Sequence, residues 1–341
     1  TTEIYTLSLH DALPISRLSY TGATTTTDRP FVFTAASLNW DISNSGTTLT
    51  LNGVIKGTNM GPLFRGGGNF VVNGLVDIGS AGVTRTDNGT VYLNCPTNAF
   101  TGNIQVSAGT ISITNIADSG VVCPIGKGNT ITVGQNGWFT TGRFRFAGPD
   151  GGSCNRAIRV ETTTNSLVHG GIIESAVAGK TLLLSGTVAP GSSSTARTPR
   201  LQLVGDGNGE LSGVISGSVS IDKSSGPGTW ILSGANTHTG TTTVSAGTLL
   251  VNGSTHADSA VTVASGGTFG GTGTVHGAVN MAAGGTLAPG AGGIIGTLVL
   301  ARAGAAALTL NGGTLAFDLG TEAGVCRSEE HTSELQSRIT I

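Results

Sequence analysis

Residues 228–253 read GTWILSGANTHTGTTTVSAGTLLVNG, and this stretch decides the fold. It contains no charged side chain, and its glycines and hydroxyl-bearing residues are mixed with small apolar ones. Apolar and polar residues alternate in short runs that end at glycine, asparagine or serine. Alternation in twos, bounded by turn-forming residues, predicts short β-strands separated by tight turns. The stretch therefore predicts one layer of a β-structure rather than a reactive site.

A degenerate copy of this stretch lies earlier in the chain. Residues 89–115 read GTVYLNCPTNAFTGNIQVSAGTISITN, and the shared VSAGT stands at 106–110 and again at 244–248. Upstream, LNGVIKG at 51–57 corresponds to LSGVISG at 211–217, and a longer insert at 58–82 interrupts the first unit. Self-similarity of this kind indicates a structural unit that is used at least twice.

A shorter period runs through the second half of the chain. Gly-Thr followed by Leu or Phe recurs, for example at 247–249, 267–269, 285–287 and 313–315, and the steps between these threonines are 20, 18 and 28 residues. Helix signals are nearly absent, since the alanine cluster at 304–308 is too short to nucleate a helix. Short strands at this spacing fit either an antiparallel sandwich or a coiled solenoid.

The return of like residues favours the solenoid. Stacked coils require inward apolar residues to form continuous columns, whereas hairpin pairing does not require the same residue in each circuit. We therefore predict an all-β, right-handed parallel β-helix, with about 20 residues per coil and a length on the order of 70 Å. Two antiparallel sheets packed face to face would contradict this prediction.

Within residues 228–253, each residue type has an expected place. Its large apolar residues are expected to point inward, and its glycines to mark corners: Trp230, Leu232, Val244, Leu249 and Val251 inward, and Gly228, Gly234, Gly240 and Gly247 at corners. The glycine pairs at 266–267, 270–271, 284–285, 292–293 and 312–313 are expected at corners that need positive φ. His238 is expected to project from a corner into solvent.

The stretch at 228–253, followed by SGGTFGGTGTVHGAVNMAAGGTLAPG at 265–290, closely resembles the autotransporter-associated β-strand repeat of bacterial secreted passenger domains. The match is strong over 205–321, weaker over 50–115 and slight over 116–204. The resemblance implies an exported β-helical passenger that is secreted or displayed at the cell surface or outer membrane of a bacterium. Its expected partners are surface glycans or other cell-surface proteins.

The two ends of the chain differ abruptly from the Gly/Thr/Val-rich segment between them. Both ends resemble translated short-read sequencing adapters, so we exclude 1–16 and 327–341 from the fold and expect them to lie loosely on the body. Burial of Leu9 and Ile15 in the core would contradict this. The remaining chain divides into degenerate coils at 17–204 and regular repeats at 205–326.

Composition excludes several classes of protein. Removing the two arginines and five acids of the ends from totals of 17 and 19 leaves 15 basic and 14 acidic residues, a net charge of +1. Hydrophobic residues at 38% do not fit solvated disorder, and no apolar run approaches the length of a membrane-spanning helix. Near-neutral charge and only 5% aromatic residues do not indicate a surface that binds nucleic acid.

The four cysteines have no metal-binding spacing. Cys95, Cys123, Cys154 and Cys326 are irregularly placed and include no CxxC pair, so buried free thiols are expected. A disulfide between Cys123 and Cys154 is the alternative in an oxidising compartment.

Catalytic motifs are missing as well. The sequence ADSG at 117–120 lacks the first glycine of a serine-protease motif and reads as a turn, as does GDGNGE at 205–210, which lacks most ligands of a calcium loop. An ice-binding surface would need paired threonines in each coil, and only one returns. We therefore assign no catalytic, cofactor-binding or metal-binding residue.

The enzymatic alternative is a polysaccharide lyase or glycosidase, because such sites occur on β-helices and need charged groups from adjacent coils to converge. Asp206, Glu210, Asp222 and Lys223 come closest to the required spacing. However, Asp222 and Lys223 align with Thr84 and Arg85 of the earlier copy, so the acid is not kept in register. The sequence therefore favours a non-enzymatic, exported rod with a structural, stalk-like or adhesive role.

Overall fold

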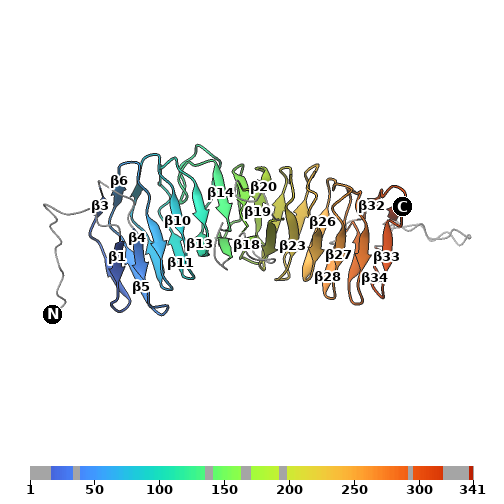
Figure 1. Cartoon of the computed structure of the whole chain (residues 1–341), viewed down its shortest axis with the longest axis horizontal. Coiled ribbons are helices and arrows are strands. Elements are labelled where there is room, and N and C mark those ends of the chain that lie inside the picture. The colour runs from blue at the N-terminus through green and yellow to red at the C-terminus, as the bar shows by residue number, and fades with distance from the viewer. Residues whose placement is uncertain are drawn as a thin grey trace, which may run out of the picture.

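In-register stacking of short strands builds a rod whose coils follow one another along its long axis (Figure 1). The computed structural model describes residues 17–33, 39–134, 141–162, 170–191, 198–290, 295–317 and, as backbone alone, 338–340. All the regular elements in these ranges are β-strands. None of them is a helix long and apolar enough to cross a bilayer.

Three long sheets and two short ones form the sides of the rod. The thirteen-stranded sheet consists of β2 (Thr25–Thr27), β5 (Thr48–Leu51), β8 (Asn69–Val72), β11 (Thr90–Leu93), β13 (Gly109–Ile113), β15 (Gly142–Phe146), β18 (Gly170–Ser175), β21 (Arg200–Val204), β23 (Ser220–Lys223), β25 (Thr242–Val244), β27 (Val261–Val263), β30 (Val279–Met281) and β33 (Leu308–Leu310). The first eight-stranded sheet consists of β1 (Arg17–Tyr20), β4 (Asn39–Ile42), β7 (Leu63–Arg65), β10 (Val83–Arg85), β12 (Ile104–Val106), β14 (Thr130–Val133), β17 (Ala157–Val160) and β20 (Val188–Pro190). The second eight-stranded sheet consists of β16 (Gly152–Cys154), β19 (Thr181–Leu184), β22 (Asn208–Leu211), β24 (Thr229–Leu232), β26 (Gly247–Val251), β28 (Gly267–Gly271), β31 (Thr286–Pro289) and β34 (Thr314–Leu315). The short sheets are β3 (Phe31–Phe33), β6 (Ile55–Gly57) and β9 (Val76–Asp77), and β29 (Thr274–Val275), β32 (Thr297–Leu300) and β35 (Arg338–Thr340).

The pairing confirms the parallel β-helix and excludes the sandwich. Neighbours in the thirteen-stranded sheet pair in parallel, for example Thr110 with Arg143 and Asp222 with Thr243. The sheet has one strand per coil, so its twelve steps of about 4.8 Å give a rod of about 58 Å. This is shorter than expected because the coils from β13 to β21 take 28 to 33 residues each, counted between strand starts.

The recurring Gly-Thr positions stack directly on one another, as the solenoid prediction requires. Thr229 pairs with Thr248, and the column continues through Thr268, Thr286 and Thr314 on the outer face of the second eight-stranded sheet. On this sheet a single threonine returns in each coil. Parallel stacking continues across residue 204, where we divide degenerate from regular coils, since β21 pairs with both β18 and β23.

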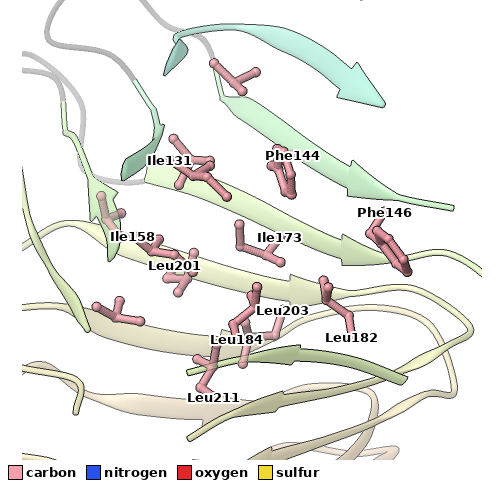
Figure 2. Packing of buried hydrophobic residues seen from close by; sticks show 14 of the residues in the cluster. Ile131, Phe144, Phe146, Ile158, Ile173, Leu182, Leu184, Leu201, Leu203 and Leu211 are labelled. Carbon is pink, nitrogen blue, oxygen red and sulfur yellow. The ribbon is translucent and has the colours of Figure 1, made fainter. Parts of the chain in front are cut away.

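The core is a continuous column of apolar side chains inside the coils. Figure 2 shows part of it, where Phe144, Ile173 and Leu203 from successive coils lie close together. The five residues of 228–253 that we expected to point inward are all fully buried: Trp230, Leu232, Val244, Leu249 and Val251. These positions were predicted correctly because alternation in twos assigns every second residue to the interior.

The glycines that we expected at corners are required for two different physical reasons. Among the four glycines of residues 228–253 that we expected at corners, only Gly247 has positive φ, at 62°. At Gly228, Gly234 and Gly240, a Cβ would instead collide with backbone of the preceding coil. The pair prediction holds at Gly266, Gly271, Gly284 and Gly312, which have positive φ, while 292–293 lie outside the described residues.

The insert at 58–82 in the first repeat unit is one additional coil. It contains β7, β8 and β9, one strand for each side of the rod. Leu9, Ile15 and most of 327–341 fall outside the described residues, so their loose attachment stays a prediction. Arg338–Thr340, however, forms β35 and pairs with β32, whose open edge offers unpaired backbone groups to an extended segment.

The described cysteines are buried free thiols. Cys95, Cys123 and Cys154 form no disulfide, so the alternative pairing of Cys123 with Cys154 is not present. Burial raises the pKa of Cys154 to about 11. Cys326 lies outside the described residues.

Stacking predicts a strong effect for a single methyl group at Gly209. A Cβ at this position would overlap the indole ring of Trp230 in the next coil. We expect Gly209→Ala to destabilise the rod by roughly 1–3 kcal/mol, measured by urea denaturation, and a second change, Trp230→Leu, to restore much of the loss. Gly46→Ala is the control, because the nearest atom lies 3.8 Å away, and it is expected to change stability by less than about 0.5 kcal/mol. Equal midpoints for Gly209→Ala and Gly46→Ala would contradict the stacking argument.

Candidate functional site

Three of the charged residues singled out by sequence spacing, Glu210, Asp222 and Lys223, do not converge. Asp222 and Lys223 are neighbours in β23 and therefore point to opposite faces of the strand. Asp222 points outward and forms an ion pair with Arg200, whereas Lys223 points into the core and is completely buried. Glu210 lies on a different sheet, where its Oε1 is 2.5 Å from the Ser233 hydroxyl. These residues do not form the candidate glycosidase or lyase site.

A charge cluster does occur on the outer face of β15 and β18. Arg143 Nη1 donates to Glu174 Oε2 at 2.6 Å, and Arg145 Nε donates to Glu174 Oε1 at 3.3 Å. The single carboxylate of this cluster is thus bound by two guanidinium groups. Glycoside hydrolysis needs two carboxyl groups, one to protonate the leaving group and one to act as nucleophile or base. The cluster explains local packing of two coils rather than catalysis.

A polar groove lies on the outer face of the first eight-stranded sheet. It consists of two adjoining hollows of about 670 and 460 Å³, and Asn103 and Thr132 line both. The floor is a column of register-paired residues from successive coils: Leu63, Thr84, Gln105, Thr132 and Arg159. Corner residues, including Asn59, Ser80 and Gly102, line one part of it. The groove therefore follows the long axis of the rod.

Most polar groups in the groove keep free hydrogen-bonding capacity. The Oδ1 atom of Asn103 accepts from the backbone N–H of Thr130 at 3.1 Å, which leaves its amino group for a ligand. Gln105 Nε2 lies 3.1 Å from the Ser107 hydroxyl, and the carbonyl oxygen of the Gln105 side chain is not used in that bond. The hydroxyl groups of Thr84 and Thr132 add donors and acceptors. The groove can thus form many hydrogen bonds without a large desolvated charge.

One end of the groove carries both signs of charge. Arg159 is exposed, and among the described residues its guanidinium makes no hydrogen bond or ion pair, unlike that of Arg65 or Arg143. Glu161 stands two residues further along and is 9% exposed. Arg159 and Glu161 together have no net charge.

Arg85 and Lys223 are cations buried in the core with backbone carbonyls as partners. Arg85 donates from Nε to the carbonyl of Gly89 at 2.9 Å and from Nη2 to that of Gly66 at 2.5 Å. Lys223 donates to the carbonyls of Ser225 at 2.9 Å and Gly226 at 2.7 Å. Burial lowers the pKa of Arg85 to about 10 and that of Lys223 to about 8. Each cation thus satisfies the carbonyl groups of a tight corner.

Comparison with known protein families matches two segments of the chain, 83–113 and 225–251, to the passenger-associated-transport-repeat. The chain carries this autotransporter-linked repeat twice. These segments largely coincide with the two copies recognised in the sequence, and the family points to an autotransporter passenger and hence to secretion or the cell surface. A search of curated proteins and a search of solved structures found no match to the chain.

The two passenger-associated repeats place equivalent residues in equivalent roles. Arg85 and Lys223 stand 138 residues apart, the same offset as the shared VSAGT, and both bind corner carbonyls. Asn98 and Asn236 have this offset too, and the Oδ1 atom of each accepts a backbone N–H of the preceding coil, at 2.8 Å from Val76 and 2.9 Å from Ile215. Aligning the two repeats places a cation, Arg85 or Lys223, at the same position. A charged residue at the end of a strand does not by itself reveal that its side chain points inward.

Equivalent strands of the two passenger-associated repeats lie on different sides of the rod. In the first repeat β10 belongs to the first eight-stranded sheet and β11 to the thirteen-stranded sheet. In the second repeat the equivalent β23 belongs to the thirteen-stranded sheet and β24 to the second eight-stranded sheet. The repeat thus advances by one side of the rod between its two copies.

The expectation that His238 projects into solvent is wrong. Its side chain is completely buried, and Nε2 lies 3.0 Å from the Ser259 hydroxyl and 3.3 Å from that of Thr242. Alternation continues through 234–242 although no strand is formed there before β25, so every second residue still points inward. The equivalent residue in the first repeat is Phe100, which is buried in the core. Aligning the two repeats could have revealed this position.

The buried cation predicts a pattern of tolerated and damaging substitutions. Lys223→Met leaves the Ser225 and Gly226 carbonyls without their donor, and we expect a loss of roughly 1–3 kcal/mol in the free energy of unfolding, measured by urea denaturation. Lys223→Arg restores the cation type of the first repeat and is expected to keep most of the stability. Lys180→Met, at an exposed lysine, serves as control and should be nearly neutral. The role assigned to Lys223 is wrong if its methionine variant matches the control.

The buried histidine predicts acid sensitivity. Burial, with a smaller effect from His256, lowers the pKa of His238 from 6.5 to about 4. Folding therefore favours the neutral imidazole, so stability is full above pH 6.5 and falls as the pH drops towards 4, by roughly 3 kcal/mol in total. We expect His238→Phe, which copies the first repeat, to remove this slope in thermal melts between pH 7 and pH 4. Phe100→His is the reciprocal variant and should steepen it. An unchanged slope in His238→Phe would contradict the assignment.

Proposed function

We propose that this chain is a segment of a non-enzymatic, exported rod that acts as a stalk or adhesive passenger at the bacterial cell surface. One observation carries the proposal: an in-register parallel β-helix contains the passenger-associated-transport-repeat twice. A rod of this kind projects its ends far apart, and each coil depends only on its neighbours, so it can be lengthened by adding coils.

The surface chemistry supports a role in contact rather than in chemical conversion. Apart from β15, β18, β21 and β23, the outer face of the thirteen-stranded sheet is uncharged, as at Thr90, Thr110, Thr243 and Thr262. Charges on that sheet are mostly engaged in pairs between coils, as for Arg200 with Asp222. Such a surface offers many weak polar contacts, which suits a stalk or an adhesin.

A polysaccharide-active enzyme remains the second candidate, and the groove is the observation that favours it. Arg159 and Glu161 stand together at one end of an elongated polar groove. In the described part of the chain, Glu161 is the carboxylate that lines this groove, whereas an acid–base pair for glycoside hydrolysis needs a second one. This shortage favours binding over turnover.

The test is surface display followed by separate measurements of exposure, adhesion and turnover. The chain is joined to a signal peptide and a heterologous outer-membrane anchor, and the fusion is produced in a bacterium that has no gene for this chain. We expect proteinase K to remove the rod from intact cells, and displaying cells to attach to surfaces or aggregate more than cells with the anchor alone. A rod that is protected from protease would contradict the surface role.

Turnover is measured with the purified chain on a panel of polysaccharides. We expect no release of reducing ends or unsaturated uronate products above a heat-denatured control. Release that is lost in Glu161→Gln would instead establish the enzymatic alternative.

A further inference from the structure

We propose that the groove on the first eight-stranded sheet binds a neutral polysaccharide chain, laid along the axis of the rod. This inference rests on the proposed adhesive function and names the ligand class of its contact site. Thr84, Asn103 and Gln105 of the groove lie within the first matched repeat, whereas Thr132 and Arg159 lie outside both matched segments.

Continuity of the two hollows defines the shape of the ligand. One hollow is lined by residues of β7, β10, β12 and β14, and the other by residues of β14, β17 and β20. Thr132 on β14 belongs to both. Six strands at about 4.8 Å give a groove of about 24 Å, which suits an extended polymer better than a small molecule.

The lining of the groove favours hydroxyl groups as partners. Thr84, Gln105, Thr132 and Asn103 present hydroxyl and amide groups at successive coils, a spacing that offers both donors and acceptors along the whole groove. A protein partner would be expected to need aromatic or aliphatic anchors, which this column does not provide beyond Leu63. Nucleic acid would need a basic stripe and stacking platforms.

The charged end of the groove favours a ligand without net charge. A polyanion would be attracted by Arg159 but repelled by Glu161. A polycation would be attracted by Glu161 but repelled by Arg159. A neutral sugar can use Arg159, because guanidinium donates to hydroxyl oxygens. Arg159 makes no interaction with the described residues, so it need not break a bond to bind.

Affinity electrophoresis of the full chain tests this proposal. Native gels contain hydroxyethyl cellulose, soluble starch, galactomannan or xylan as neutral polymers, and polygalacturonate as the acidic one. We expect retardation by at least one neutral polymer and none by polygalacturonate beyond a gel without polymer. Thr132→Glu places a charge where the hollows meet and should weaken the apparent affinity at least tenfold.

The matched control is Thr243→Glu. Thr243 is likewise a half-buried, outward-facing threonine at the centre of a strand, but it lies on the thirteen-stranded sheet. This variant should bind like the wild type. Thermal melts of both variants check folding, and Gln105→Ala, a truncation at an exposed groove residue, is expected to weaken binding at least threefold even if Thr132→Glu melts early.

Three results would overturn the inference. These are no retardation by any of the neutral polymers, stronger retardation by polygalacturonate, and equal binding by the wild type, Gln105→Ala and Thr132→Glu. The display assay separates this failure from that of the proposed function. If displayed cells still adhere and Thr132→Glu cells adhere equally well, the rod is adhesive through another surface and only the groove assignment falls.

Discussion

The whole structure depends on parallel pairing in register, which places each residue about 4.8 Å above its counterpart in the preceding coil. A column can persist only if neighbouring side chains tolerate that spacing. Threonine does so on the outer face from Thr229 to Thr314, and aliphatic and aromatic residues do so inside. Where a bulky ring fills the interior, as at Trp230, the coil below has a glycine, Gly209. Sequence variation is therefore constrained one coil at a time.

The same stacking creates the problem that the buried cations solve. Tight corners turn carbonyl groups towards the interior, where water cannot reach them, and unpaired carbonyls are costly. Arg85 and Lys223 donate to these groups in the two repeats, and Arg156 does so in the middle coils, with Gly126 at 2.6 Å and Ala117 at 2.9 Å among its acceptors. The charge is stabilised by backbone dipoles rather than by a buried acid. A long rod can thus keep an apolar core and still turn sharply in every coil.

The groove arises from the same geometry on the outside. Residues that are 21 to 27 positions apart in the sequence, such as Thr84, Gln105, Thr132 and Arg159, become neighbours because they occupy the same outward position of successive coils. No short motif marks such a surface. An elongated, hydroxyl-rich and charge-balanced groove is what a rod can offer to an elongated, hydroxyl-rich polymer.

The sequence by itself determined the strands, the parallel stacking and the inward residues, because period-two alternation and the return of Gly-Thr are local properties that stacking directly requires. It also contained the repeat that the family comparison identifies. Alternation alone did not place His238 correctly, since it continues through a segment that forms no strand, although Phe100 of the first repeat marks the equivalent position as apolar. Only the tertiary structure decided that equivalent repeats lie on different sides of the rod, and which outward side chains meet in the groove. Both depend on how many residues each intervening coil uses, which the sequence of one coil does not specify.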